Sequence, residues 1–262
     1  MRKHYLSKRL MSVALSLAVA AGASLLWPVG VVKAILNGQP DTNNLYPYVG
    51  LVTDGEFVCS GSAISPTLFI TAAHCFSTPG GPVSVTFDQQ GLFAQNPAFV
   101  SGTWHPDPDF CIGCGPGTPG FDQHDVAVVV FDQPVSLPRY AQLPTLGLAG
   151  AQSMGTAVKI VGYGIQDRLR RLDPDELFTR YFAPSRLIQS NHSFGDEFLK
   201  LSANPSQGKG GICFGDSGGP VLLGDTDIIL ANNSFVTNSN CAGVTYHYRL
   251  DTAEALSFIN LF

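Results

Sequence analysis

The feature that most constrains the fold is a succession of short strand-like runs, each bounded by glycine, proline or asparagine. The chain has 28 Gly and 18 Pro among 262 residues, which favours frequent turns over long helices. A first set of runs covers Tyr48–Thr53, Phe57–Ile64, Leu68–Ala72, Val83–Phe87, Ala98–Trp104 and Val126–Phe131. A second set covers Ala157–Tyr163, Arg180–Phe182, Glu197–Leu201, Pro220–Leu223, Ile228–Leu230 and Val244–Leu250. This spacing predicts an all-β protein, either an antiparallel barrel or a sandwich.

The segments between and after these runs complete the expected organisation. Pro134–Gly150, rich in Pro, Leu and Gly, reads as a linker between the two sets. Asp167–Arg186 holds interleaved charges and is expected to form a solvated surface loop. The chain should end in a helix over Thr252–Phe262, with Asp251 as its N-cap.

The N-terminal segment has the layout of a secretory signal. Residues 1–34 carry five Lys or Arg and no acid, and an apolar stretch runs from Leu10 to Val32. Candidate cleavage sites follow Ala23 and Ala34, so a short pro-segment, 24–34, is an alternative. A membrane anchor is the competing interpretation, but the small residues and Pro28 favour a cleaved signal. We therefore expect a secreted protein, extracellular or periplasmic, with no membrane contact after signal removal.

Charge and hydrophobicity exclude two classes of protein. Without its first 34 residues the chain has 10 basic and 20 acidic residues, a formal net charge of −10. That balance argues against a nucleic-acid or anionic-membrane partner, which would need a basic face. A hydrophobic content of 45% with 13% charged residues also excludes disorder.

The six cysteines fit an oxidising compartment. They fall as Cys59 with Cys75, Cys111 with Cys114, and Cys213 with Cys241, although spacing alone does not fix the pairing. Cys111-Ile-Gly-Cys114 reads as a loop disulfide, with a redox motif as an alternative. Flanking His105 and His124 would complete a zinc cluster, but the spacing matches no finger pattern.

Three local sequence patterns contain candidate catalytic residues. They are Thr71-Ala72-Ala73-His74-Cys75, His124-Asp125-Val126, and Gly215-Asp216-Ser217-Gly218-Gly219-Pro220. Each alone could be structural: a core histidine, a turn acid, a tight turn. Together they supply a hydroxyl, an imidazole and a carboxylate, the parts of a serine nucleophile with its base and orienter. The glycines would let backbone N–H groups converge where an oxyanion develops.

On these motifs the chain, from Ile35 to its C-terminus, resembles the chymotrypsin-type (trypsin-like) serine proteases. The resemblance implies two perpendicular six-stranded antiparallel β-barrels, the first over about residues 35–140 and the second over about 150–262. It implies His74 as general base, Asp125 as its orienter and Ser217 as nucleophile, with the N–H groups of Gly215 and Ser217 as the oxyanion hole. Cys59–Cys75 and Cys213–Cys241 match disulfides common in the family, whereas Cys111–Cys114 does not.

The nucleophile-elbow pattern of α/β-hydrolases is also present at Ser217, with Asp225 or Asp227 and His247 as partners. That fold needs strands alternating with helices, and no helical periodicity precedes Ser217. The protease interpretation is therefore preferred.

The resemblance also implies activation by a new N-terminus. The ammonium group of Ile35 would pair with Asp216, which shapes the oxyanion loop. Cleavage after Ala34 would create this terminus, so export and activation would be one event. Cleavage after Ala23 would leave a pro-segment, Ser24–Ala34, still to be removed.

Substrate preference is expected from positions that shape the pocket in the family: Gly211, Phe214, Ser234, Phe235, Val236 and Thr245. The floor position, Gly211, has no carboxylate to pair with a buried Arg or Lys. Val236 and Thr245 resemble the elastase branch. We expect cleavage after small or medium aliphatic residues, with a Glu-preferring enzyme that uses Thr245 or His247 as the alternative.

A catalytically silent binding module on the same fold is a competing class. For the enzyme, the expected partners are protein or peptide substrates, without cofactor or metal, and the expected state is a monomer. Asn191-His192-Ser193 and Asn232-Asn233-Ser234 fit the glycosylation sequon, although the second overlaps the substrate-binding strand.

Overall fold

The computed structural model describes residues 34–115, 122–165, 178–190 and 197–262. The predicted export signal lies outside these residues, except for Ala34. None of the helices in the described ranges is long and apolar enough to cross a membrane.

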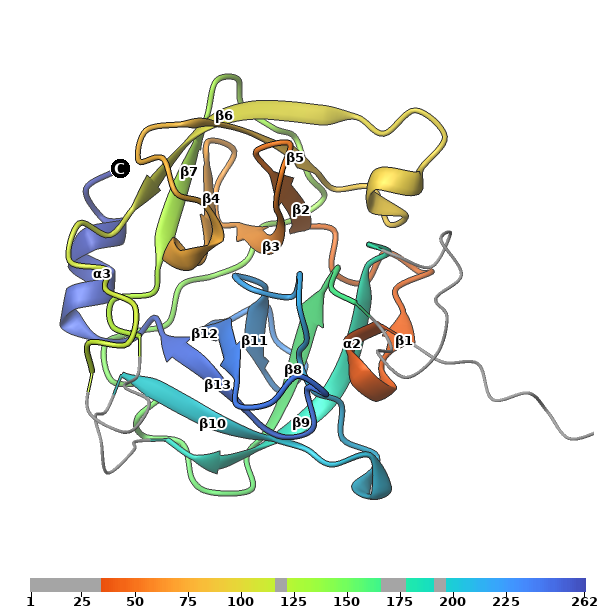
Figure 1. Ribbon diagram of the computed structural model, residues 1–262, viewed down its shortest axis with the longest axis vertical. Coiled ribbons are helices and arrows are strands. Elements are labelled where there is room, and N and C mark those ends of the chain that lie inside the picture. The colour runs from red at the N-terminus through yellow and green to blue at the C-terminus, as the bar shows by residue number, and fades with distance from the viewer. Residues whose placement is uncertain (1–33, 116–121, 166–177, 191–196) are drawn as a thin grey trace, which may run out of the picture. The chain divides into compact units, whose positions relative to one another are not determined.

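The first barrel is built from six antiparallel strands that close on themselves (Figure 1). They are β2 (Val49–Thr53), β3 (Val58–Ala63), β4 (Leu68–Thr71), β5 (Pro82–Thr86), β6 (Phe99–Pro106) and β7 (Ala127–Phe131). Their order around the barrel is β2-β3-β4-β7-β6-β5. All six runs of the first predicted set are therefore strands, with ends shifted by one or two residues.

The second barrel repeats this plan further along the chain. Its strands are β8 (Ala157–Gly162), β9 (Tyr181–Gln189), β10 (Phe198–Ala203), β11 (Pro220–Leu223), β12 (Ile229–Val236) and β13 (Gly243–Arg249). It closes because β8 pairs with both β9 and β11. A short strand that was not predicted, β1 (Gln39–Pro40), adds to the outer edge of β9. The all-β, two-barrel prediction is confirmed.

Two strands of the second barrel are longer than predicted. β9 continues from Tyr181 through Pro184 to Gln189, because Ala183, Ser185 and Leu187 alternate as buried residues with exposed neighbours. The expectation of a solvated loop over Asp167–Arg186 is thus wrong for its last part, and Arg180 is fully buried. β12 likewise runs on to Val236.

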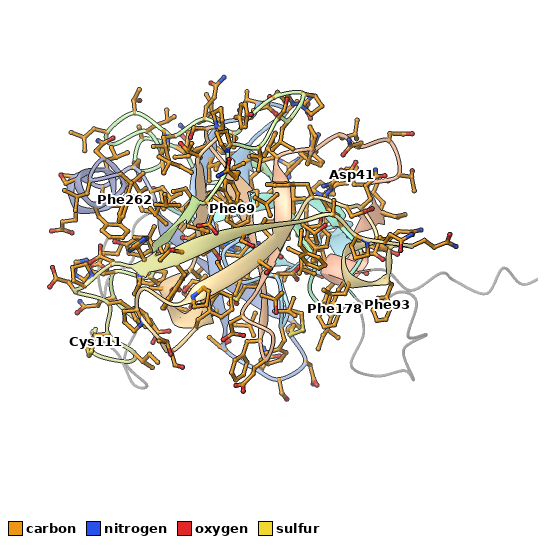
Figure 2. All side chains as sticks on the ribbon, turned by 90° about the horizontal axis from the view of Figure 1, so that it is seen from above. Asp41, Phe69, Phe93, Cys111, Phe178 and Phe262 are labelled. Carbon is orange, nitrogen blue, oxygen red and sulfur yellow. A yellow bond between two sulfur atoms is a disulfide. The ribbon has the colours of Figure 1, made fainter. Side chains whose placement is uncertain are left out.

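Each barrel encloses apolar side chains. In the first barrel the buried ring of Phe69 (labelled in Figure 2) contacts the rings of Phe87 and Phe131, and the ring centroids of each pair are 6.0 Å apart. The second barrel holds a cluster that includes Ile160, Leu199 and Leu201. Outside the strands, Phe93 of the 3-10 turn η2 (Gly91–Phe93) stacks on Phe178 (Figure 2).

The C-terminal helix is shorter than predicted and has a different cap. α3 spans Ala253–Ile259, and the side chain of Thr252 accepts a hydrogen bond from the N–H of Ala255. Asp251 is not the cap, because its carboxylate is committed to Arg249 and to the N–H of Ala149.

Three disulfides join Cys59 to Cys75, Cys111 to Cys114, and Cys213 to Cys241. The sulfurs of Cys111 and Cys114 are bonded to each other, so they are not free thiolates for the alternative zinc site. His105, one of the two histidines of that alternative, packs against the ring of Phe262.

Candidate active site

His74 and Asp125 come together at the end of the first barrel where β4 ends and β7 begins. His74 lies in the 3-10 turn η1 (Ala73–Cys75), directly after β4, and Asp125 lies just before β7. His74 Nδ1 is 2.8 Å from Asp125 Oδ2, and the backbone N–H of His74 donates to Oδ1 at 3.0 Å. Ser234 of β12 donates its hydroxyl to the same Oδ2. The carboxylate therefore binds donors on both oxygens although it is fully buried.

The pair fixes the charge and tautomer of the imidazole. Burial alone would raise the pKa of Asp125, but His74 and the hydrogen bond from Ser234 bring it below its ordinary value. Burial would lower the pKa of His74, and the charge of Asp125 raises it above its ordinary value. Because an ionised carboxylate only accepts, His74 Nδ1 carries the proton and Nε2 is left as a proton acceptor.

The loop that presents Ser217 is held by backbone contacts from both barrels. The N–H of Ser60, on β3, donates to Ser217 O at 2.8 Å, and the N–H of Gly218 donates to Asn233 O at 2.7 Å. A side chain at Gly218 could not be accommodated, since its Cβ would lie 2.3 Å from Thr71 Oγ1. Glycine is thus required for this close approach of the loop to β4.

The same loop exposes two unused backbone donors. Gly215 has φ 95°, in the region that glycine tolerates. Within the part of the chain that the structure describes, the N–H groups of Gly215 and Ser217 donate no hydrogen bond. They are available to an oxyanion.

His74 and Ser217 face one cavity of about 490 Å³ between the barrels. No hydrogen bond joins their side chains in the described residues, a looseness that is common before substrate binds. The other lining residues are Ile212, Cys213, Phe214 and, from β12 onward, Ser234 to Ser239. None of these carries a charge. The predicted pocket residues Gly211 and Thr245 do not line this cavity.

Gly211 and Thr245 are both buried in the packing of the second barrel. A Cβ at Gly211 would be 2.4 Å from the Cβ of Ala203, so the position is closed by packing. The hydroxyl of Thr245 lies 2.7 Å from His247 Nε2, and His247 Nδ1 lies 2.9 Å from Asn233 Oδ1. Burial lowers the pKa of His247 to about 3, so this imidazole is neutral.

Asp216 is a buried carboxylate without a cationic partner among the described residues. Its oxygens accept from the N–H groups of Gly164 and Cys213, each at 2.8 Å. Burial raises its pKa to about 7. Ile35, the predicted partner, is fully buried next to Gly210, and no hydrogen bond or ion pair joins it to Asp216 within the described ranges. In the full chain its nitrogen is an amide and carries no charge.

Asn232 and Asn233 are neighbours of this site that the sequence did not identify as functional. Both are buried, with their amides hydrogen-bonded to backbone oxygens, so the second sequon is inaccessible to modification. Their signal was a pair of adjacent amides that directly follows the apolar run Ile228–Ala231. The first sequon, at Asn191, lies outside the described residues.

The chain is similar in sequence and in fold to known serine proteases. The family model described as Trypsin matches residues 35–251. The cercarial protease of Schistosoma mansoni is 29% identical over 213 residues, which are 72% of this chain and 74% of that protein. The structure of neuropsin, a serine protease of mouse brain, aligns with a TM-score of 0.68 and 18% identity over 87% of this chain and 99% of that one.

A structure of the scabies mite inactivated protease paralogue S-D1 aligns almost as well. Its TM-score is 0.67 at 16% identity, over 87% of this chain and 97% of that one. Similarity of fold alone therefore does not distinguish an active from an inactive protease. Whether this chain is active must be judged from the residues of its site.

Proposed function

The chain belongs to the trypsin family of serine proteases, and we propose that it is an exported endopeptidase in which Ser217, His74 and Asp125 carry out acyl transfer. The observation that supports this assignment best is the hydrogen bond of 2.8 Å between His74 Nδ1 and the buried Asp125. It leaves His74 Nε2 as an acceptor, in the same cavity as Ser217. The family acts on peptide bonds, so the substrates are proteins or peptides.

In the proposed reaction, Ser217 Oγ attacks the carbonyl carbon of the scissile bond while His74 Nε2 takes the hydroxyl proton. The carbonyl oxygen becomes an oxyanion, for which the N–H groups of Gly215 and Ser217 are the available donors. His74 then returns the proton to the leaving amine, and the acyl-enzyme remains. Water, deprotonated by the same nitrogen, releases the acid and regenerates Ser217. Asp125 stays ionised and stabilises the imidazolium in both steps.

The buried carboxyl group of Asp216 is the reason to propose that cleavage before Ile35 activates the enzyme. A buried carboxylate without a cation is unstable as an anion, and an ammonium group at Ile35 would supply the missing charge. In the uncut chain Ile35 has φ 41°, which is strained for a β-branched residue. Cleavage after Ala34 would release that strain and create the ammonium together.

Export is proposed on the N-terminal layout and on the disulfides. Three disulfides are stable in an oxidising compartment and rare in a reducing one. We propose that removal of residues 1–34 by the export machinery yields the active form directly.

The preference for small or medium aliphatic residues rests on the lining of the cavity. Ile212, Phe214 and Val236 offer apolar surface, and none of the described lining residues is an acid that could pair with Arg or Lys. A cation desolvated there would lack a partner. Apolar pockets discriminate weakly, by about 1–3 kcal/mol per methylene, so we expect a graded preference.

The Glu-preferring alternative is less well supported. Asn233 Oδ1 accepts from His247 Nδ1, so His247 Nε2 has no proton and accepts from the hydroxyl of Thr245. The Thr245 hydroxyl proton is therefore committed and is not available to a substrate carboxylate.

A cleavage profile on a mixed peptide library tests the proposal. The protein would begin at Ile35, with Ser217→Ala as the matched control. We expect cuts after Ala, Val or Leu that are absent in the control. Cuts after Arg or Lys would support the proposed acyl transfer by Ser217 but would contradict the proposed preference for aliphatic residues. Absence of cuts, with no labelling of Ser217 by a phosphonylating reagent, would favour the silent binding module.

A second preparation tests the activation step. A form that begins at Ser24 should cleave at most weakly, because its Ile35 nitrogen is an amide. Full activity of that form would reject the pairing of Ile35 with Asp216 as the activating event.

A further inference from the structure

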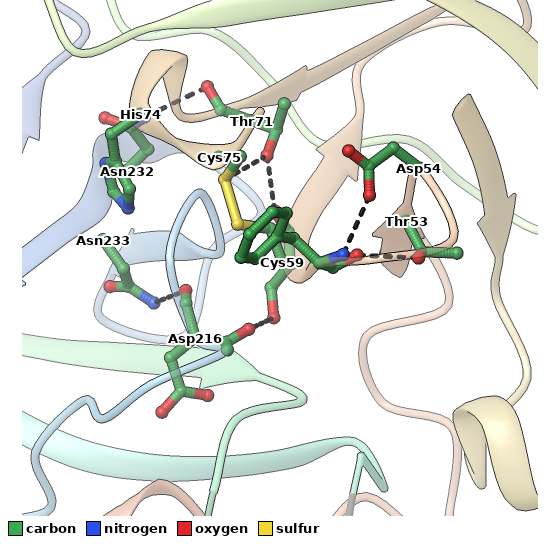
Figure 3. Close-up of a disulfide and its surroundings, with 12 residues drawn as sticks. Thr53, Asp54, Cys59, Thr71, His74, Cys75, Asp216, Asn232 and Asn233 are labelled. Atoms are coloured by element: carbon green, nitrogen blue, oxygen red, sulfur yellow. Dashed lines mark hydrogen bonds between the residues drawn. A yellow bond between two sulfur atoms is a disulfide. The ribbon is translucent and has the colours of Figure 1, made fainter. Parts of the chain in front are cut away.

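β12 carries two consecutive buried asparagines, which contact opposite halves of the site. We propose that Asn232 and Asn233 are positioning residues: Asn232 holds the segments that carry His74 and Asp125, and Asn233 holds the loop that carries Ser217. This inference rests on the proposed function. Figure 3 shows the Asn232 side chain hydrogen-bonded to Thr71 and the Asn233 side chain hydrogen-bonded to Asp216.

Asn232 reaches from the second barrel to the first. Its Nδ2 donates to Asp125 O at 2.9 Å and to Thr71 O at 3.2 Å. Thr71 is the last residue of β4, immediately before the turn of His74. One amide therefore ties the backbone of the orienting acid to the strand that delivers the base.

The oxygen of the Asn232 side-chain amide is evidence against a purely structural role for this residue. Asn232 Oδ1 is buried and has no hydrogen-bond partner in the described ranges. An unpaired buried acceptor destabilises a fold, and an apolar side chain of similar size would avoid it. What asparagine adds at this position is the pair of hydrogen bonds to the segments of His74 and Asp125.

Asn233 acts on the nucleophile loop from inside the second barrel. Its backbone accepts from the N–H of Gly218 and donates to Gly219 O, each at 2.7 Å. Its Nδ2 donates to Asp216 O at 3.1 Å. These contacts fall on both sides of Ser217 and so fix where its hydroxyl lies.

The orientation of Asn233 is itself determined by His247. Nδ2 donates to a carbonyl, so the atom that faces His247 is the amide oxygen, at 2.9 Å from Nδ1. His247 must therefore present a proton on Nδ1, and Thr245 completes the chain by donating to Nε2. A flip of the Asn233 amide would break the contacts at both ends.

The two residues can serve both halves because successive side chains of a strand point to opposite faces. The separation between Asp125 and the nucleophile loop is then set by one strand rather than by the flexible connections between barrels. Catalysis is sensitive to this separation, since a displacement of about 1 Å can cost about 100-fold in rate.

The test compares Asn232→Leu and Asn233→Leu with Asn260→Leu, a control at the exposed end of α3. Each is measured on the form that begins at Ile35, with a peptide selected from the library. We expect kcat to fall by about 10- to 100-fold in both variants. KM should change by less than about threefold, because neither side chain faces the substrate cavity.

A pH profile separates the two roles. In Asn232→Leu the carboxylate of Asp125 is held less firmly, so the midpoint of the acid limb should move to lower pH. In Asn233→Leu that midpoint should stay at the wild-type value while kcat falls. A residue that only supports the fold would move neither quantity once rates are corrected for the folded fraction.

The outcomes that overturn the inference are distinct from those that overturn the function. If both variants match Asn260→Leu, or if only KM changes, neither asparagine positions the site. If the leucine variants do not fold, Asn232→Ala and Asn233→Ala replace them, and failure of these to fold would show a structural role instead. A wild-type protein that neither cleaves peptides nor reacts with the phosphonylating reagent would reject the proposed function itself.

Discussion

The hydroxyl of Ser234 donates a hydrogen bond to Oδ2 of Asp125, so a strand of the second barrel supports a carboxylate of the first. The same oxygen lies 2.8 Å from His74 Nδ1. Asp125 is thereby surrounded by donors, which explains how a fully buried carboxylate keeps a pKa below its ordinary value. The charge that this carboxylate retains is what acts on His74.

The pH dependence of cleavage follows from that charge. His74 must be neutral to accept the proton of Ser217, and Asp125 raises its pKa. We expect kcat/KM to fall as pH is lowered through a midpoint above about 6.5, the ordinary histidine value. A rate that stays constant down to about pH 5 would show that His74 is not the base.

Asp125→Asn should reduce kcat by about 10⁴-fold, because an amide that donates to Nδ1 would favour the wrong tautomer. The matched control is Ser234→Ala, which leaves the carboxylate but removes one donor. We expect that variant to lose about 1.5–3 kcal/mol of unfolding free energy in a urea titration. Equal rates for Asp125→Asn and wild type would contradict the assigned role.

Much of the fold could be predicted because strands follow local rules. Runs such as Leu68–Ala72 and Val126–Phe131 are apolar and bounded by turn residues, and both form strands. β9 was underestimated because Pro184 and Arg186 interrupt the apolar run, although alternating residues still face the core. Only pairing with β8 and β10 shows that these positions belong to a strand.

Polar side chains buried by distant partners could not be predicted. Arg180, Asn233 and His247 would be solvated in an isolated segment, and each is buried here because its partners come from other strands. The motif residues His74, Asp125 and Ser217 were found because their local patterns are distinctive, not because of where they face. The pocket positions Gly211 and Thr245 have no such pattern, and neither lines the cavity that was expected to contain them.

The packing at Gly211 gives a prediction about engineered specificity. Gly211→Asp alone should not produce cleavage after Arg or Lys, since its Cβ would collide with Ala203 at 2.4 Å. We expect instead a lower melting temperature and loss of activity. The double variant Gly211→Asp, Ala203→Gly relieves the collision and should recover part of the lost stability and activity, still without cleavage after Arg or Lys, because position 211 does not line the cavity. Ala203→Gly alone is the control, and efficient Arg cleavage by the single variant would refute this packing argument.

The carboxyl group of Asp216 predicts how stability of the uncut chain depends on pH. Its pKa is raised to about 7 when folded, from 3.8 when unfolded. Between these values the folded state keeps a proton that the unfolded state releases, so stability falls as pH rises. The full shift corresponds to about 4 kcal/mol.

Melting curves at about pH 4 and pH 7, on the uncut chain carrying Ser217→Ala to prevent self-digestion, measure this loss. Asp216→Asn in the same background should be less sensitive to pH over that range. The form that begins at Ile35 should also lose less stability, because its ammonium would lower the pKa of Asp216. If all three forms respond alike to pH, the carboxyl group is not the cause.

The last prediction concerns the buried ion pair between Arg180 and Asp41, whose Nε and Oδ2 are 2.9 Å apart. Both side chains are fully buried. Arg180 lies beside β9 of the second barrel, yet its guanidinium donates to Val49 O and Phe87 O of the first at 2.9 and 3.1 Å. Asp41 also accepts from the N–H of Leu45, so Asn at this position could satisfy only some of these donors.

Removing one partner leaves the other charge buried and unpaired. We expect Asp41→Asn and Arg180→Met each to lower the unfolding free energy by about 3–5 kcal/mol in urea titrations. The double variant should lose less than the sum of the two, because no lone charge remains. Asp225→Ala, which breaks a surface pair with Lys159 from its exposed side, is the control and should change the midpoint little, since water already solvates the Asp225 carboxylate. Additive losses in the double variant would mean that the pair contributes through its separate backbone contacts rather than through the interaction of its charges.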